Sequence, residues 1–355
     1  MLKPAPRKGR KKPQIVKQQP AVLRPVPMVE KSGKVFGSSW ILSDITGIHQ
    51  AANTPGTMHI GLLSTSVNVY STGRLVEEAQ KLGLQVILAD PSNCSVKLGW
   101  GGPRILMGAK DITHAFQAII PRIGTQLTPH GAAIVAQFEM NGVFSTARSA
   151  GILRAGNKVQ TLQLLSGRGI AIPKTLFSIN PDTIEAQIAL LGGAPLIIKL
   201  QEGTQGLGVV LAESVRSAKS IADTFYKMHT PVLLQEYIAE SGGTDIRILV
   251  VGDRVVASME RCSALGEFRS NMHRGGHAQR VDPRPEELQM ALQAARYLGL
   301  GVAGVDLIRS DRGPLLIEVN ASPGFKGMEE VTGVNVAGAI LSYVMQAVEG
   351  KIAPL

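Results

Sequence analysis

Regular spacing of hydrophobic and polar residues begins at Met58. From there, short apolar runs alternate with segments whose apolar residues recur every three or four positions; the runs predict strands and the helical spacing predicts helices. The predicted strands are 58–63, 84–89 and 118–123, and the predicted helices are 73–83 and 129–141. Strands that alternate with helices predict an α/β domain with a parallel sheet, which we place at 58–152.

The rhythm changes near Asn157, where strands begin to follow one another without an intervening helix. Gly252-Asp253 lies between two apolar runs, which is the sequence signature of a β-hairpin. The predicted strands are 195–200, 209–212, 232–238, 246–251, 254–260, 304–309 and 315–320, and the predicted helices are 158–165, 182–191, 215–228, 285–298 and 336–348. Consecutive hairpins predict an α+β region with antiparallel sheets.

Composition and charge narrow the class of protein. Of the 355 residues, 44% are hydrophobic and 18% are charged, which is typical of a folded chain. The net charge of +10 is concentrated in the Pro-rich segment 1–57, which holds ten Lys or Arg and two acids; the rest of the chain holds 27 and 25. We therefore expect a basic arm at 1–57, disordered in part, and a near-neutral body, which argues against a nucleic-acid-binding core.

The same composition disfavours membrane and secreted classes. No apolar run approaches the roughly 18 residues that a membrane-spanning helix needs. Two cysteines, Cys94 and Cys262, cannot form a disulfide framework. We therefore expect a cytoplasmic protein.

Three polar residues lie on the last predicted hairpin. Glu318 and Asn320 are two positions apart, so their side chains share one face of the strand. A tight turn centred near Arg312 sets Asp306 across from Glu318, with Cβ atoms roughly 5 Å apart. Two carboxylates and an amide oxygen on one face suit a hard divalent cation, Mg²⁺ or Mn²⁺, shared with phosphate oxygens. The alternative is a polar face turned to solvent.

The apolar run at 195–200 carries a lysine near its end. Lys199 is followed by a glycine-rich stretch at 202–208. A lysine beside exposed backbone N–H groups can clamp a phosphate, because the ammonium supplies charge and the loop supplies donors. The pattern is neither the P-loop nor the dinucleotide-binding glycine motif, and an ordinary glycine turn is the alternative.

Two further segments carry groups that could bind a nucleotide or an anion. Residues 235–238 end a strand, where they could meet an adenine edge or ribose hydroxyls, and Asp245 follows shortly afterwards. In the basic segment 261–277, Arg269 and Arg274 could bind a carboxylate or a phosphate bidentately. A simple strand end and a solvated loop are the alternatives.

Taken in order along the chain, these segments resemble the ATP-grasp superfamily, and within it the RimK family of ribosomal-protein glutamate ligases. The more specific pieces are Ala118-Ile-Ile-Pro-Arg-Ile-Gly124 and Phe268-Arg-Ser-Asn-Met-His-Arg-Gly-Gly276. Glu202-Gly-Thr-Gln-Gly and Leu316-Ile-Glu-Val-Asn-Ala-Ser-Pro-Gly324 are shared more widely among carboxylate–amine ligases. The resemblance covers 58–345, and residues 1–57 have no counterpart in it.

The resemblance implies an ATP-grasp fold, in which the N-terminal parallel-sheet domain precedes two α+β lobes, 153–240 and 241–350, that enclose Mg-ATP. The implied nucleotide-binding residues are Lys158, Lys199, Glu202, Gly203, Thr204, Gln205, Gly206, Gln235, Glu236, Tyr237, Ile238, Asp245, Arg269, Ser270 and Asn271. Lys199 and Arg269 are the implied catalytic residues. The implied ligands of two Mg²⁺ or Mn²⁺ ions are Asp306, Glu318 and Asn320, with Glu318 bridging the ions.

The resemblance also implies an activity: an ATP-dependent carboxylate–amine ligase that joins glutamate to the C-terminal carboxylate of the sixth small-subunit ribosomal protein through an acyl phosphate. Such an enzyme could add several glutamates and act as a homo-oligomer. The basic arm, which has no counterpart in the family, could contact RNA or the ribosome, bind another acidic partner, or be inert. One alternative keeps this chemistry but takes a small molecule, a carrier protein or a free peptide as acceptor.

Two other classes fit the sequence less well. An RNA-binding module with a vestigial ATP site is disfavoured by the near-neutral body and by the complete set of Asp306, Glu318 and Asn320. A dinucleotide-dependent dehydrogenase is disfavoured because the first strand and the turn after it, 58–66, contain only Gly61.

Overall fold

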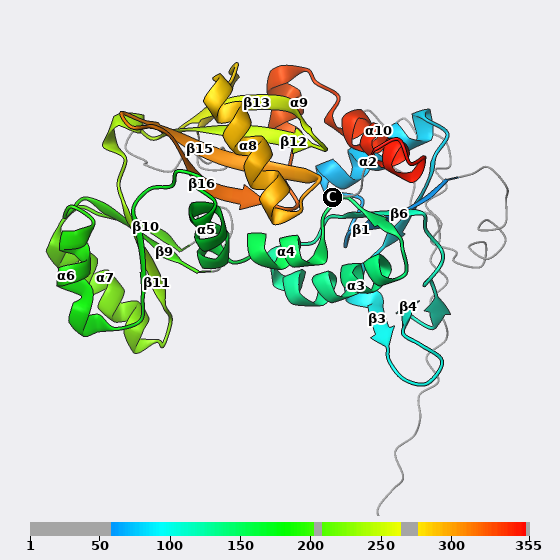
Figure 1. The fold of residues 1–355 in the computed structure, drawn as a ribbon, viewed down its shortest axis with the longest axis horizontal. Helices are drawn as coiled ribbons and strands as arrows, with labels where there is room; N and C mark the ends of the chain where they lie inside the picture. Colours follow the sequence, from blue (N-terminus) through cyan, green and yellow to red (C-terminus); the bar gives the residue numbers. More distant parts are fainter. Residues whose placement is uncertain (1–57, 202–207, 264–275, 353–355) are drawn as a thin grey trace, which may run out of the picture. The chain divides into compact units, whose positions relative to one another are not determined.

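The computed structural model describes residues 58–201, 208–263 and 276–352, all of which belong to one compact unit, Ile45–Leu355. Figure 1 shows the helices and strands coloured along the chain. The predicted arm at 1–57, the loop residues 202–206 and the segment 269–271 lie outside the described residues.

The described chain opens with a parallel sheet of strand order β2-β1-β6-β7. Its elements are β1 (His59–Leu63), α2 (Tyr70–Lys81), β2 (Gln85–Ala89), β6 (Ala118–Pro121), η3 (Thr125–Leu127), α3 (Thr128–Met140) and β7 (Phe144–Ser145). All five residues of β1 are buried, which is typical of a central strand in a parallel sheet. The prediction of an N-terminal α/β domain with a parallel sheet is confirmed.

A small antiparallel sheet, which the hydrophobic pattern does not predict, follows β2. Its elements are η2 (Pro91–Asn93), β3 (Cys94–Lys97), β4 (Arg104–Met107) and β5 (Lys110–Asp111). These strands hold two to four residues each and include exposed charged positions, so no apolar run marks them. The Arg104 guanidinium donates to the Asp111 carboxylate at 2.8 Å and joins the strands at the surface.

A smaller α+β lobe is built on an antiparallel sheet of strand order β10-β9-β11-β8. Its elements are β8 (Thr175–Ser178), η4 (Pro181–Thr183), α6 (Ile184–Leu190), β9 (Leu196–Leu200), β10 (Val209–Ala212), α7 (Val215–Lys227) and β11 (Val232–Glu236). The helices α4 (Ser149–Ala155) and α5 (Lys158–Gly167) precede this lobe and bury Ile152 and Leu165 in a different cluster, which also holds Leu63 and Leu316. Ile188, Ala222 and Leu234 belong to one buried cluster, so α6 and α7 pack on this sheet.

A larger lobe holds an antiparallel sheet of strand order β14-β13-β12-β15-β16. Its elements are η5 (Ala239–Ser241), β12 (Thr244–Val251), β13 (Arg254–Cys262), β14 (His277–Arg280), α8 (Pro285–Leu298), β15 (Val302–Ser310), β16 (Gly313–Asn320), α9 (Lys326–Thr332) and α10 (Val336–Val348). Gly252, with a φ of 64°, closes the predicted hairpin between β12 and β13. The prediction of antiparallel sheets in this half is confirmed.

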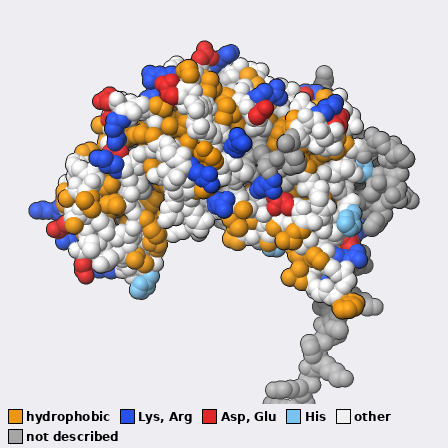
Figure 2. Space-filling model, viewed as in Figure 1, with side chains coloured by type: hydrophobic (Ala, Val, Ile, Leu, Met, Phe, Trp, Pro, Cys, Tyr) orange, Lys and Arg blue, Asp and Glu red, His pale blue; other side chains and the backbone are white. Residues whose placement is uncertain are grey.

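The larger lobe and the N-terminal domain share buried apolar clusters. Ile60 of β1, Leu249 of β12 and Val344 of α10 lie in one cluster, and the rings of Phe144 and Tyr343 meet edge-on with centroids 5.6 Å apart. Figure 2 shows Lys and Arg interspersed with Asp and Glu on the face that it draws, as the near-neutral charge of this region predicts.

In the part of the chain that the structure describes, no single helix is long and apolar enough to cross a bilayer. The pair α9 and α10 passes that test only together, and the chain bends by 110° between them.

Candidate active site

The hairpin of β15 and β16 places three predicted metal ligands in register. Asp306 lies across from Glu318, as predicted, and Gly304 lies across from Asn320. The turn itself is shorter than expected: Ser310 pairs with Gly313, which alone would pair Asp306 with residue 317. A bulge at Ile317 inserts one residue in β16 and brings Glu318 opposite Asp306.

The loop after β16 packs directly on β15 because Gly304 has no side chain. A Cβ at Gly304 would lie 2.8 Å from Cβ of Pro323 and 3.8 Å from Cβ of Asn320. Such a close approach is possible only for glycine. The segment that begins at Asn320 is therefore held against the strand that carries Asp306.

Asp306 belongs to a chain of charged side chains that extends over β12, β13 and β15. Arg247 of β12 donates to both carboxylate oxygens of Asp306, through Nε at 2.6 Å and Nη2 at 2.5 Å. Arg261 of β13 lies 3.1 Å from the same carboxylate and donates to both oxygens of Asp245 at 2.6 and 2.7 Å. Burial alone would raise the pKa of Asp306, but Arg247 and Arg261 outweigh it and hold the pKa below its usual value.

Two lysines, one at the start of α5 and one on β9 of the smaller lobe, meet the acids of the hairpin. Lys158 begins α5, directly after the N-cap Asn157, and its Nζ lies 3.8 Å from Oε1 of Glu318. Lys199 is half-buried near the end of β9. Burial lowers the pKa of Lys199 to about 8; Glu318 and Asp306 oppose this shift, and Lys158 adds to it. Residues far apart in sequence therefore form one cluster of charges.

The predicted metal ligands fit a hard divalent cation. Asp306 accepts three hydrogen bonds and so keeps about one of its four lone-pair positions for a metal ion. The side chain of Glu318 is 38% exposed, and the buried Nδ2 of Asn320 has no hydrogen-bond partner among the described residues. Among these residues no group of three or more His, Cys, Asp or Glu side chains is placed to hold a metal ion, and the predicted set differs from such a group because it combines two carboxylates with one amide.

The segment 235–238 is held by its own side chains. Nε2 of Gln235 donates to Oγ1 of Thr175 at 2.8 Å. Oε1 of Glu236 accepts from the Lys174 backbone N–H and from Nη2 of Arg312, both at 2.6 Å. Glu236 therefore connects the end of β11 to the turn of the β15–β16 hairpin. The predicted adenine contacts of the segment, including those of Tyr237 and Ile238, stay predictions.

Sequence reasoning missed Arg247, Arg261 and Arg312 as members of this site. Arg247 could have been suspected, because charged residues alternate with apolar ones at 245–248 inside a strand. Arg312 carries no such signal, since an arginine in a polar turn is ordinary. Asp245 is predicted to face a ribose; the structure places its carboxylate on Arg261, and the ribose contact stays a prediction.

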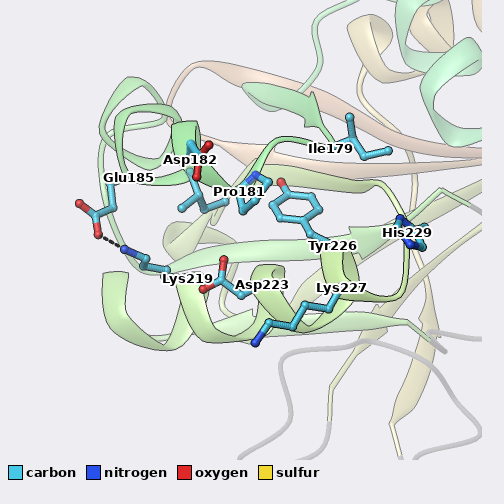
Figure 3. Close-up of a pocket in the computed structure, with 10 residues that line it drawn as sticks. Ile179, Pro181, Asp182, Glu185, Lys219, Asp223, Tyr226, Lys227 and His229 are labelled. Carbon is cyan, nitrogen blue, oxygen red and sulfur yellow. Dashed lines mark hydrogen bonds and ion pairs between the residues drawn. The ribbon is translucent and has the colours of Figure 1, made fainter.

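A hollow of about 590 Å³ lies elsewhere, on the outer side of the smaller lobe (Figure 3). It is lined by η4, α6 and α7 residues that include Asp182, Lys219, Tyr226 and His229, and Lys219 forms an ion pair with Glu185 at its rim. None of the predicted site residues lines it.

Comparison with known proteins identifies the family of the chain. A model of the RimK-like ATP-grasp domain matches residues 155–344, and a model of the RimK PreATP-grasp domain matches 58–152. The chain is 48% identical to a probable alpha-L-glutamate ligase 1 of Hahella chejuensis over 83% of this chain and 97% of the relative. It is 47% identical to a probable alpha-L-glutamate ligase of Thioalkalivibrio sulfidiphilus, over 81% and 96%.

A solved structure of the ATP-grasp ligase PsnB with its minimal precursor has the same fold. It superposes with a TM-score of 0.65 at 20% identity and covers 81% of this chain and 98% of that one. The family matches and the relatives named alpha-L-glutamate ligase show an ATP-dependent carboxylate–amine ligase of the ATP-grasp class. Within that class, the chain belongs to the RimK-like ATP-grasp family.

The unusual pKa of Lys199 predicts a specific pH profile. Because that pKa is about 8, the charged form that attracts phosphate predominates below pH 8 and is lost as the pH rises through it. We expect kcat/KM for ATP to fall above that pH in the wild type. In Lys199→Arg the guanidinium stays charged, so this alkaline limb should vanish. Identical profiles for the two proteins would contradict the assignment.

Proposed function

We propose that the protein attaches glutamate to the C-terminal carboxylate of a ribosomal protein, the sixth of the small subunit, and can add several glutamates in turn. The observation that carries the proposal is the convergence of Lys158 and Lys199 on Glu318 and Asp306. The relatives named alpha-L-glutamate ligase support the choice of glutamate. The complex of PsnB with a precursor peptide is consistent with a peptide or protein acceptor in this fold.

The chemistry follows from the inertness of a carboxylate toward an amine at neutral pH. A terminal carboxylate oxygen of the acceptor attacks the γ-phosphorus of ATP, the bond to ADP breaks, and an acyl phosphate forms. The amine of glutamate then attacks the acyl carbon, phosphate leaves, and an amide remains. Negative charge gathers on the transferring phosphoryl group, and Lys158, Lys199 and Arg269 offset it.

Asp306, Glu318 and Asn320 would hold Mg²⁺ or Mn²⁺, as two ions with Glu318 between them. A bound ion of this kind supplies charge neutralisation at the phosphate oxygens. We assign the remaining predicted nucleotide contacts to Glu202, Gly203, Thr204, Gln205, Gly206, Gln235, Glu236, Tyr237, Ile238, Asp245, Ser270 and Asn271.

The same proposal gives the basic arm a role. Residues 1–57 carry most of the net positive charge of the chain and could contact ribosomal RNA while the acceptor is modified. We place the enzyme in the cytoplasm, where ATP and ribosomes are found, and propose that it acts as a homo-oligomer.

Mass spectrometry of the native small ribosomal subunit tests the proposal. With the full-length protein, ATP and glutamate, one ribosomal protein should gain a ladder of masses spaced by one glutamate residue, and Lys199→Ala should produce none. No added mass on any ribosomal protein would contradict the acceptor. If free peptides or free glutamate gained the mass instead, the ligase chemistry would stand with a different acceptor.

A further inference from the structure

Arg122 is a partly buried cation whose guanidinium is incompletely bound. It follows β6, in the motif Ala118-Ile-Ile-Pro-Arg-Ile-Gly124. Nη2 donates to Oγ of Ser71 at 2.8 Å and to the backbone oxygen of Pro323 at 2.7 Å. The buried Nε has no hydrogen-bond partner among the described residues. Since a guanidinium has five N–H donors, Nε and Nη1 remain to bind something else.

The other partly or fully buried arginines of the described chain all have acidic partners. Arg74 pairs with Glu77 and Glu329, Arg247 with Asp306, Arg261 with Asp245, and Arg309 with Glu287. Arg122 pairs with no described Asp or Glu.

The carboxylate of Glu329, on α9, is already bound by other groups. Glu329 of α9 accepts from Arg74 and from the hydroxyl of Tyr70, and the ring of Tyr70 meets the ring of Phe325. The guanidinium of Arg122 lies 5.7 Å from the centroid of that Phe325 ring. A desolvated cation without a counter-charge is costly, so the arrangement indicates that an anion completes it.

The place of Arg122 in the fold suits a ligand. Its backbone N–H donates to the oxygen of Leu63 at 2.8 Å, so it lies at the carboxyl ends of β1 and β6. β1 lies between β2 and β6, and the chain runs from β1 first to β2 and only later to β6. Parallel sheets bind ligands at such a switch point, outside the carboxyl ends of the strands.

The same end of the sheet contacts the segment that follows β16, at Ser322 and Pro323. Oγ of Ser322 accepts from the Ile123 backbone N–H at 3.2 Å, and Pro323 accepts from Arg122. Asn320 is three residues before Pro323, which limits the separation of their Cα atoms to about 11 Å. An anion on Arg122 would therefore lie close to the proposed site of phosphoryl transfer.

We propose that Arg122 binds a carboxylate of the amine substrate and so selects glutamate. The inference rests on the proposed function. In the proposed function, Lys158 and Lys199 bind the ATP phosphates and the reacting acceptor carboxylate. Glutamate brings two further carboxylates that do not react in this step, and these need another cation. Burial lowers the pKa of Arg122 to about 10, so the side chain stays protonated at neutral pH.

Steady-state kinetics of Arg122→Gln test the proposal in the full-length enzyme. Loss of a charged hydrogen bond to a substrate should raise the KM for glutamate by about 10- to 100-fold, with the KM for ATP changed less than about twofold. Added guanidinium should restore part of the loss. Ser71→Ala removes one acceptor of Arg122 but keeps the charge, and Arg168→Gln removes an exposed arginine elsewhere; both should leave the KM for glutamate within about threefold of wild type.

Substrate analogues identify the carboxylate. Glutamine lacks the side-chain carboxylate and the α-amide of glutamate lacks the other; wild-type enzyme should reject the analogue that has lost the group held by Arg122. Arg122→Gln should lose that discrimination. If this variant does not fold, Arg122→Lys can be used instead. Lysine keeps the positive charge but lacks the planar set of guanidinium donors, so it should raise the KM for glutamate by a smaller factor.

Two outcomes would overturn the proposal. One is an unchanged KM for glutamate in folded Arg122→Gln, or in folded Arg122→Lys where the first variant does not fold. The other is an equal rise of both KM values without guanidinium rescue, which would mean that Arg122 only supports the Ser322–Pro323 segment. Failure of the proposed function is distinguishable: wild-type enzyme would then form no glutamate-dependent ADP with the ribosomal acceptor, whatever the behaviour of the Arg122 variants.

Discussion

Lys199→Ala should lower kcat/KM for ATP by about 100- to 1,000-fold, the cost of removing one preorganised donor from a site that stabilises developing charge. Lys199 lies among Lys158, Glu318 and Asp306, where the transferring phosphoryl group would sit. ADP formation measured against ATP concentration gives the ratio. The protein should stay folded, because Lys199→Ala removes a positive charge that is desolvated and that lies near the positive charge of Lys158.

Lys219→Ala is the matched control for this loss. Lys219 lies on α7 of the same lobe and pairs at the surface with Glu185. Removal of this exposed cation should change kcat/KM for ATP less than about twofold. Near-normal turnover in Lys199→Ala, or an equal loss in Lys219→Ala, would remove the basis for the site.

Asp306→Asn and Glu318→Gln should both abolish most of the activity but differ sharply in stability. Asparagine at 306 leaves the guanidinium groups of Arg247 and Arg261 beside a neutral amide, and breaking a buried ion pair costs about 3–5 kcal/mol. The side chain of Glu318 is 38% exposed, and its ion pair with Lys158 is long, at 3.8 Å. Its replacement should therefore lower the free energy of unfolding by about 0–1 kcal/mol.

Urea unfolding and ADP formation, measured on the same samples, separate the two effects. Glu318→Gln should unfold near the wild-type midpoint while its activity is lost. Because Asp306 has a lowered pKa, its contribution to wild-type stability is present above its ordinary value of 3.8 and is lost as the pH falls below that value. A stable Asp306→Asn, or an active Glu318→Gln, would argue against these roles.

The hydrophobic pattern predicted the elements that carry the chemistry better than the contacts between them. The runs at 304–309 and 315–320 gave the hairpin, and the alternation of side chains in a strand placed Glu318 and Asn320 together. The pairing of Asp306 with Glu318 was predicted from a turn centred near Arg312. The structure reaches the same pair with a shorter turn and a bulge at Ile317.

Contacts between distant segments could not be read from the sequence. The approach of Lys158 to Glu318 depends on how α5 packs against β16, and the Asp245–Arg261–Asp306–Arg247 chain depends on the register of three strands. The sheet of β3, β4 and β5 was missed because its strands are too short and polar to show a period. By contrast, β1 and β6 are mainly apolar and buried along their whole length, and they were found directly.

The central claim is that this cluster activates a carboxylate with ATP, and isotope transfer tests it most directly. An acceptor peptide or ribosomal protein whose terminal carboxylate carries the heavy isotope of oxygen is incubated with wild-type enzyme, ATP, Mg²⁺ and glutamate, and the released phosphate is analysed by mass spectrometry. One heavy oxygen atom should appear in the phosphate released when the first glutamate is joined to the labelled carboxylate; later additions activate the unlabelled carboxylate of an added glutamate and should release ordinary phosphate. Phosphate that carries only ordinary oxygen, with product still made, would contradict the account.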